Sequence, residues 1–313
     1  MLSRIADSLF WLNRYMVRSD GLLRTTRTNY ILLLDKGINE HLTWQYVLEI
    51  FTHTPAEERV SLQYDTGEVL HRLLTDDKNI NSLKALLTKA RENARSIQDH
   101  ITKEVWEQVN QMYHLVNQPY LESRLRSQAA LDTVDSFLSQ STLYAGVINS
   151  TMPRTLGWCF MNLGQYIERA LLTIEMTQKF LGFIYYDLKD EKNILQWRPM
   201  LLSLSGYELH LKTYRNHNYN ENALHQVLFN TEFTRSVLYC LSRIDKYLKE
   251  VLEQNQAEEK HTLLRRFGRL YSKVQFTELD TLNTVTLHQF FNEIRTELNE
   301  FSTQLGQILF SYA

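Results

Sequence analysis

The sequence predicts an all-α fold, and three observations carry this prediction. Glycine and proline are scarce, with 10 and 4 residues in a chain of 313. Long stretches therefore lack the turn residues that a β fold needs between its strands. Apolar residues recur at steps of three and four, the spacing of one helix face. No alternating β-branched run is long enough for a strand. We expect a bundle of long helices.

The predicted helices follow from apolar stripes, taken in chain order. The first stripe is formed by Leu2, Ile5, Leu9, Leu12, Met16 and Leu23. Similar stripes predict helical segments over 83–116, 125–147, 156–181, 233–252 and 279–309. Pro153 suits the opening turn of a helix, whereas Pro119 and Pro199 are expected to separate helices.

Two helix starts carry recognisable capping signals. Thr54 is followed by Pro55 and Glu57, which combines a cap, a proline in the first turn and a capping-box acid. Thr277 stands three residues before Asp280, a similar arrangement at the start of the last stripe.

A weak internal similarity relates the two halves of the chain. Leu12–Arg18 lines up with Leu163–Arg169, with tyrosine and arginine at matching places in both segments. Two divergent repeats over 1–150 and 151–313 would explain this, although helical sequences also resemble one another by chance. Because helices from two repeats can interleave in one bundle, we expect a single domain over 1–313.

Composition bounds the class of protein. With 34 Lys+Arg against 36 Asp+Glu, the net charge is −2, which argues against a protein that coats nucleic acid or an anionic membrane. Asp7 interrupts the N-terminus before any apolar core of useful length, so no secretory signal is expected. The longest uncharged run, 136–153, is too polar for a membrane span. These features predict a cytoplasmic protein.

The usual catalytic and metal-binding signatures are absent from the sequence. It contains no glycine-rich nucleotide-binding loop, no serine-hydrolase elbow and no H-E-x-x-H. Cys159 and Cys240 stand far apart, so we expect two buried, reduced thiols. The densest histidines, His210, His217 and His225, lack matching carboxylates or thiols. No metal and no cofactor is therefore expected.

Arginine and aromatic residues border the core face of two predicted helices. One group is Arg4, Trp11, Tyr15 and Arg18, and the other is Arg154, Trp158, Gln165 and Arg169. Each spans roughly 60° of its helix. Such a stripe could line an internal cleft that receives carboxylate or phosphate groups. The alternative is a set of border residues whose stems cover apolar surface while their heads reach water.

A second polar cluster lies at 90–95. Arg95 has Glu92 and Asp99 within one helical turn, so local pairs can neutralise it. Arg91 has no acid at those spacings, which leaves an acid of another helix, a ligand anion or water as its partner. Asn93 in mid-helix is mildly unfavourable, so we expect it to be exposed or to make a polar contact.

Glu168 and Arg169 are adjacent and point about 100° apart on a helix, so they do not pair with each other. Glu168 could act as a general acid or base near a substrate. The structural alternative, which we favour, is an ion pair with Arg14 or Arg18 of the first helix.

Several ordered segments share a pattern. They are the opening from Met1 to Tyr15, Ala90–Arg95 followed by Glu104–Glu107 with Trp106, then Asn110, Glu168-Arg169-Ala170, and Tyr214-Arg215. Together these segments resemble the alpha-E family, bacterial proteins named for an α-helical domain with a Glu-Arg motif. The family usually has Glu-Arg in the first helix too, but Val17 precedes Arg18 here and Asp20 replaces a frequent Glu. Because this chain lacks that glutamate, the resemblance implies either that the family's first-helix glutamate is structural or that any catalytic role is confined to Glu168.

The resemblance also implies a functional setting. Alpha-E genes tend to lie beside genes for ATP-grasp ligases and transglutaminase-like proteins, which become the expected partners. ATP-grasp enzymes join carboxylates to amines through acyl-phosphates. Our first hypothesis is an accessory subunit that binds a substrate or partner. Acidic groups would be clamped by Arg4, Arg18, Arg91 and Arg169, and the cleft would be walled by Trp11, Tyr15 and Trp106. The substrate-binding set also includes Asn93, Arg95, Tyr214 and Arg215. The rivals are an enzyme in which Glu168 is the acid or base and Arg169 stabilises negative charge, and a plain scaffold.

Overall fold

The computed structural model describes residues 2–35, 43–183, 186, 194–253 and 260–310. Across these ranges the chain forms fifteen α-helices and two short 3-10 helices, and it contains no strand. The predicted all-α fold is confirmed. Among the described residues, no helix combines the length and apolarity that crossing a membrane requires.

The chain divides into two compact units. Unit 1 comprises Met1–Arg14 with Arg154–Ala313, and unit 2 comprises Tyr15–Pro153. The first helix, α1 (Ser3–Leu34), contributes its opening turns to unit 1 and the remainder to unit 2. The predicted repeats over 1–150 and 151–313 stay a prediction.

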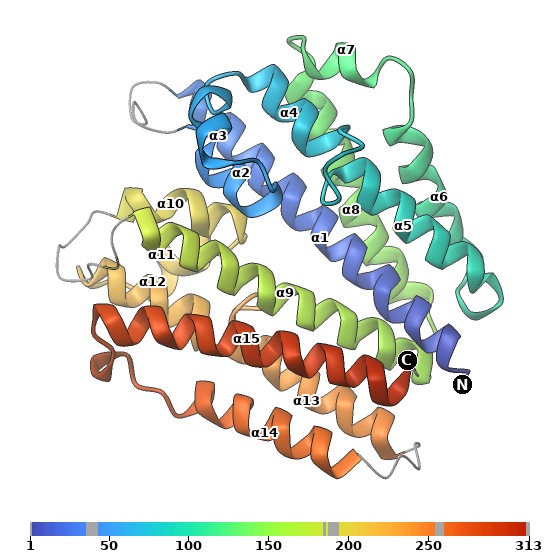
Figure 1. Cartoon of the computed structure of the whole chain (residues 1–313), viewed down its shortest axis with the longest axis vertical. Coiled ribbons are helices and arrows are strands. Elements are labelled where there is room, and N and C mark those ends of the chain that lie inside the picture. Colours follow the sequence, from blue (N-terminus) through green and yellow to red (C-terminus); the bar gives the residue numbers. More distant parts are fainter. Residues whose placement is uncertain (1, 36–42, 184–185, 187–193, 254–259, 311–313) are drawn as a thin grey trace. The chain divides into compact units, whose positions relative to one another are not determined.

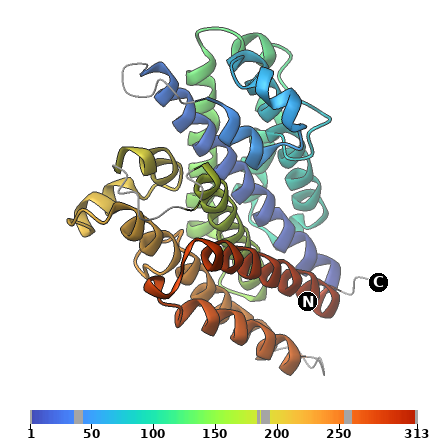
Figure 2. The ribbon, with the colours of Figure 1, turned by 60° about the vertical axis from the view of Figure 1, so that its left-hand side comes forward.

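Unit 1 is built on four long helices that pack in a closed order (Figure 1). They are α9 (Leu156–Phe183), α13 (Val237–Glu253), α14 (Lys260–Gln275) and α15 (Thr284–Leu309). Each contacts the next, and α15 returns to α9. Figure 2 shows α14 and α15, in orange and red, side by side. Their apolar faces are buried, and the rings of Phe267 and Phe301 lie 4.9 Å apart across the α14–α15 seam. This burial follows from the three- and four-residue apolar spacing.

Three short helices cover one end of α9 and α13. They are α10 (Ile194–Ser203), α11 (Tyr207–Thr213) and α12 (Tyr219–Leu228). The prediction that Pro199 separates helices is wrong, because Pro199 lies inside α10. Buried Trp197 holds this helix in place, since its Nε1–H donates to Asn220 at 2.7 Å and its ring lies 4.4 Å from Phe180. Tertiary packing outweighs the local cost of the proline.

Among the residues described, unit 2 contains the second part of α1 and seven further α-helices. They are α2 (Gln45–Phe51), α3 (Ala56–Leu62), α4 (Thr66–Leu74), α5 (Leu83–Ser96), α6 (Lys103–Val116), α7 (Leu121–Leu125) and α8 (Ala130–Thr151). The predicted segment over 83–116 is two helices that pack against each other. A 3-10 turn, η1 (Gln98–His100), separates them, and the Thr102 hydroxyl then accepts from the Val105 N–H at 3.4 Å to cap α6.

The two predicted capping signals are wrong in detail. Pro55 occupies the cap position of α3, and no side chain caps that helix. The last helix begins after Asn283, whose side chain accepts from the backbone N–H groups of Val285 and Thr286 at 3.0 Å each. Thr277 and Asp280 therefore precede the helix. An amide oxygen that satisfies two terminal N–H groups is the stronger start signal.

The two thiols agree with the prediction from the sequence. Cys159 and Cys240 are both free and buried.

Candidate functional site

The Glu-Arg motif lies in the middle of α9, and its glutamate is part of a buried ion pair. Glu168 is 2% exposed. Its Oε2 accepts the Nε–H of Arg14 at 2.8 Å and lies 2.8 Å from Nη2 of the same guanidinium. Arg14 belongs to α1 and is itself buried. The preferred alternative for Glu168, an ion pair with an arginine of the first helix, is confirmed.

Arg14 is held by further contacts in unit 1. Its Nη1–H donates to the Ser302 hydroxyl of α15 at 3.0 Å. The guanidinium carbon lies 4.7 Å from the Trp11 ring centroid and 5.6 Å from that of Phe10. These aromatic faces add cation–π attraction in a desolvated setting. The pair is therefore enclosed by protein groups.

A glycine allows the opening of α1 to approach α9 closely. A Cβ atom on Gly164 would lie 2.2 Å from the backbone oxygen of Phe10. Beside this crossing, the Asn13 side-chain amide donates to the Met161 carbonyl at 2.9 Å. The absence of a side chain at Gly164 lets the helices meet where Arg14 reaches Glu168.

Arg169, the second motif residue, has different neighbours. Its guanidinium carbon lies 5.6 Å from the Tyr166 ring centroid, and that of Arg243 on α13 lies 5.8 Å from the same centroid. Arg243 also donates to the Tyr247 hydroxyl at 2.9 Å. The Tyr166 and Tyr247 rings stack with centroids 6.1 Å apart and planes 14° apart. We call Tyr166, Arg169, Arg243 and Tyr247 the arginine–tyrosine cluster.

The positive charge of this cluster reaches its neighbours. Burial raises the pKa of the Tyr166 hydroxyl, while Arg169 and Arg243 oppose that rise. Burial raises the pKa of Cys240 to about 12, again against the opposing effect of Arg169 and of Arg235. Tyr166 and Cys240 therefore both lie within electrostatic reach of Arg169.

Cys159, at the start of α9, is directed to a carboxylate. Its thiol donates to Glu250 at 3.1 Å, and Glu250 also lies 3.8 Å from Lys246. Burial and this hydrogen bond raise the pKa of Cys159 to about 12. A thiol held in its protonated form is a poor nucleophile.

Other residues of the two predicted stripes each have their own neighbours and do not form one group in the described contacts. Trp11 packs on Arg14, while Arg4 is exposed. Arg154 stacks on Trp158 with its guanidinium carbon 3.6 Å from the ring centroid. Arg154 is exposed and packs on an aromatic face, and whether the two stripes line a cleft stays a prediction.

In unit 2, Arg91 forms a second cation–aromatic group. Its Nε–H donates to Asn110 at 2.7 Å, and its guanidinium carbon lies 4.5 Å from the Tyr113 centroid and 5.7 Å from that of Trp106. Of the predicted partners for Arg91, an acid of another helix is not among the described contacts. The structure provides an amide oxygen and two rings of α6.

The neighbouring predicted residues have local roles. Asn93 donates to the Lys89 carbonyl at 3.1 Å, a bond within its own helix, and is half-buried. Arg95 is exposed, and among the described residues it forms no ion pair with Glu92 or Asp99, contrary to expectation. The cost of fixing two exposed side chains explains why such pairs fail to form.

The first-helix residues Tyr15 and Arg18 belong to unit 2. The Lys89 ammonium lies 5.7 Å from the Tyr15 ring centroid. Arg18 donates to the Asn81 side chain at 2.8 Å. Arg18 and Arg91 thus have separate neighbourhoods within their unit.

Tyr214 joins a hydrogen-bond network around the histidines of unit 1. Its hydroxyl lies 2.8 Å from His225 Nδ1 and accepts from Asn230 at 3.1 Å. Burial raises the pKa of this hydroxyl, and it lowers the pKa of His210, which stacks on the Tyr214 ring. Arg215 is exposed.

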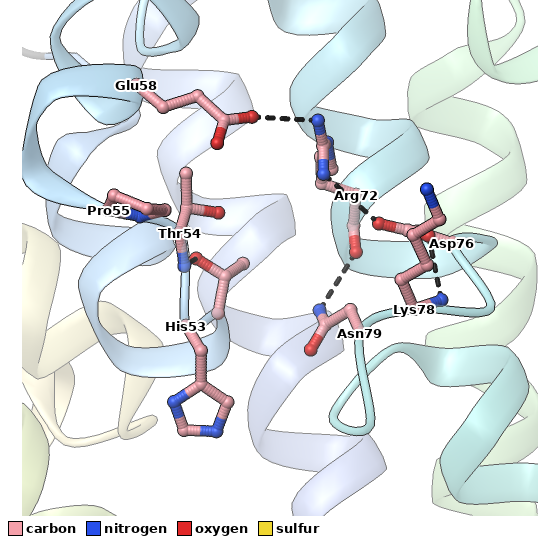
Figure 3. Close-up of a pocket in the computed structure, with 9 residues that line it drawn as sticks. His53, Thr54, Pro55, Glu58, Arg72, Asp76, Lys78 and Asn79 are labelled. Carbon is pink, nitrogen blue, oxygen red and sulfur yellow. Dashed lines mark hydrogen bonds and ion pairs between the residues drawn. The ribbon is translucent and has the colours of Figure 1, made fainter.

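A polar pocket of about 190 Å³ opens in unit 2. Figure 3 shows Arg72 reaching Glu58, at 2.8 Å, and Asp76, at 3.5 Å. The Arg72 carbonyl also accepts from Asn79 at 2.9 Å. Because Arg72 already has acidic partners, this pocket offers no uncompensated guanidinium. In the described part of the chain, no group of three His, Cys, Asp or Glu side chains could hold a metal ion.

The candidate residues are thus partly brought together. Trp11 joins the Glu168 ion pair, Trp106 joins Arg91, and Arg169 joins residues that the sequence interpretation missed, namely Arg243 and Tyr247. The sequence feature that could have indicated Arg243 and Tyr247 is their spacing of four residues, which places them on one face of α13. Whether the predicted set binds a substrate stays a prediction.

Comparison with known proteins agrees with the helical motif. The Alpha-E family model, described as "a predicted alpha-helical domain with a conserved ER motif", matches residues 1–310. The chain is 22% identical over 293 residues to the uncharacterized proteins Mb2597 of Mycobacterium bovis and MT2643 of Mycobacterium tuberculosis. The match covers 84% of this chain and 32% of each relative, so the chain spans about a third of their length. No solved structure matches the chain.

Proposed function

The chain belongs to the Alpha-E family, and on that premise we propose that it is a binding subunit of an ATP-grasp-type amide or peptide ligase system. In this proposal the chain holds an acidic substrate or a growing peptide for the ligase, and it catalyses no reaction itself.

One observation carries this proposal: of the two residues of the Glu-Arg motif, the glutamate is in an ion pair and the arginine is not. Glu168 is buried and paired with Arg14 at 2.8 Å, while Arg169 makes no ion pair within the described part of the chain. A general acid or base must exchange a proton with its substrate. An arginine without an acid is suited instead to bind carboxylate or phosphate groups.

The ligase assignment rests on the setting that family resemblance implies. ATP-grasp ligases activate a carboxylate as an acyl-phosphate intermediate, which the amine then attacks with release of phosphate, so an accessory protein that binds oxyanions suits their chemistry. A transglutaminase-like protein, which acts on amide groups, is the second expected partner.

The proposal is tested by purifying the tagged chain from its native cells and identifying co-purifying proteins by mass spectrometry. We expect an ATP-grasp ligase or a transglutaminase-like protein in a fixed ratio to the chain. The same tag on an unrelated helical protein is the control. Recovery of the chain alone contradicts the proposal.

The same preparation tests the rival hypotheses. Turnover of amide substrates by the purified chain, abolished in Glu168→Gln, would replace the binding subunit with an enzyme. A scaffold predicts that Arg169→Gln lowers the melting temperature and changes no binding constant.

A further inference from the structure

The arginine–tyrosine cluster on α9 and α13 combines two half-buried guanidinium groups with a shared aromatic ring. We propose that Arg169 and Arg243, together with the Tyr166 and Tyr247 hydroxyls, form a binding site for an oxyanion, a carboxylate or a phosphate group. This inference rests on the proposed function, since it names the residues and the ligand chemistry of the binding subunit.

The first step is geometric. Both guanidinium carbons lie within 6 Å of one ring centroid, at 5.6 Å for Arg169 and 5.8 Å for Arg243. Arg243 is oriented by its bond to the Tyr247 hydroxyl at 2.9 Å, and Tyr247 is fixed by stacking on Tyr166. Two cations from different helices are therefore held at one ring by protein contacts alone.

The second step is the charge balance. Three acids close to the cluster in sequence are already engaged: Glu168 with Arg14 at 2.8 Å, Asp245 with Lys249 at 2.6 Å, and Glu250 with Cys159 at 3.1 Å. Within the described residues of unit 1, no carboxylate pairs with either arginine of the cluster. Among the residues that the structure describes, the positive charge of the cluster is therefore not balanced by a paired carboxylate.

The third step concerns unused hydrogen-bond donors. The Nε–H groups of Arg169 and Arg243 are both enclosed and have no hydrogen-bond partner in the described structure. Buried donors are nearly always satisfied, and those that are not often mark a bound water or ion. Both arginines of the cluster therefore have a donor available, and their common position at the Tyr166 ring distinguishes them from Arg198, whose unsatisfied donor stands alone at Tyr207.

An oxyanion satisfies all three observations. Guanidinium groups bind carboxylate and phosphate oxygens through paired N–H donors, with partial desolvation strengthening the attraction. Neutral ligands would leave two cations unbalanced. Acidic protein segments and small acids share this chemistry, as do phosphorylated compounds, and the experiment separates the sources.

The test uses the full chain titrated with inorganic phosphate and, separately, with glutarate, by calorimetry at low ionic strength. Either Arg169→Gln or Arg243→Gln is expected to weaken binding at least about tenfold, because one charged hydrogen bond is lost in each. Arg198→Gln is the matched control. Arg198 is an arginine of the same unit that packs on one tyrosine, Tyr207, at 5.9 Å, and its Nε–H is also unsatisfied. Its removal should leave binding unchanged.

Binding of phosphate alone identifies a phosphorylated ligand, and binding of glutarate alone identifies a carboxylate. Either result, lost in both variants, supports the site. Absence of binding by both anions, or binding that Arg169→Gln and Arg243→Gln leave unchanged, overturns it. Tyr247→Phe, which keeps both charges, provides a second variant should Arg243→Gln fail to fold, and an intact site requires it to weaken binding by a smaller factor.

The outcome is separable from the purification experiment. If a ligase co-purifies but no anion binds, the site assignment falls and the partner assignment stands. If anions bind but no ligase is recovered, the site stands and the partner assignment falls.

Discussion

Removing Arg14 should destabilise unit 1 strongly, because it leaves a buried carboxylate without its counter-ion. Glu168 is 2% exposed, and Arg14 supplies two N–H groups to its Oε2, each 2.8 Å away. Breaking one side of a buried ion pair costs about 3–5 kcal/mol of unfolding free energy. Arg14→Met also removes the hydrogen bond to Ser302, worth about 1 kcal/mol. We expect the total loss at the upper end of this range.

A double variant distinguishes the net contribution of the ion pair from the cost of leaving the Glu168 carboxylate buried without a counter-ion. Arg14→Met combined with Glu168→Leu replaces both charges with apolar side chains of similar size. Such replacements are often neutral or stabilising for a buried pair. The double variant should therefore be more stable than Arg14→Met, with an interaction energy of about 2–3 kcal/mol in the double-mutant cycle.

The measurement is urea unfolding of the unmodified protein, Arg14→Met, Glu168→Leu and the double variant. Unfolding is followed by circular dichroism and by tryptophan fluorescence, since Trp11 lies beside the pair. Lys249→Met is the control, because Lys249 pairs with Asp245 at 2.6 Å on the exposed surface of α13. Its loss should cost less than about 0.5 kcal/mol. The reasoning is refuted if the interaction energy between Arg14 and Glu168 is no larger than the unfolding free energy lost in Lys249→Met.

Three further predictions concern other parts of the fold. Gly164→Ala should lower the unfolding free energy by about 3 kcal/mol in urea unfolding, since its Cβ would meet backbone. By contrast, Gly268→Ala, with nothing within 4 Å, should raise it by about 0.5–1 kcal/mol. Cys240 has a pKa raised by burial from 9.0 to about 12, so the folded state retains its proton longer than the unfolded state. Stability should then fall as pH rises from 9 towards 12, by about 1.4 kcal/mol at pH 10, and Cys240→Ala should reduce this slope in alkaline urea titrations. Arg91→Lys should lower the thermal midpoint of the protein, with a loss of about 1 kcal/mol, because an ammonium lacks both the planar guanidinium face that lies on Tyr113 and the Nε–H that donates to Asn110. An unchanged midpoint argues against the stack.

The sequence predicted the fold class well because helical periodicity is a local property. The stripe over 156–181 corresponds closely to α9, whose burial follows from the same apolar positions. The stripe over 83–116 was continuous in sequence yet forms two helices. Its break depends on the Thr102 cap and a 3-10 turn, without a glycine or proline to mark it. Helix existence is thus more predictable than helix boundaries.

The site was less predictable, because its contacts join distant segments. The ion pair of Glu168 was expected, since adjacent helical residues cannot pair and the first helix carries arginines. The partner of Arg169 was not expected, because Arg243 lies on another helix and its spacing to Tyr247 is common in helices. Only the packing of α13 against α9 brings these residues to the same tyrosine.

The two residues of the Glu-Arg motif have different neighbours, and this difference favours binding over catalysis as the proposed function. Protonation of Glu168 would break its ion pair and leave the Arg14 charge buried, so a proton-transfer role opposes the energetics of its site. Arg169 needs no change of protonation to bind an oxyanion, because a guanidinium stays charged at all accessible pH. Adjacent helical residues point about 100° apart, so one motif can anchor α9 to the first helix and present a cation towards α13. The anchoring glutamate then fixes the backbone that carries Arg169, the arginine that we propose to bind an anion. A single mutation at Glu168 should therefore weaken anion binding indirectly, with a loss of stability, whereas Arg169→Gln should weaken binding with little loss of stability.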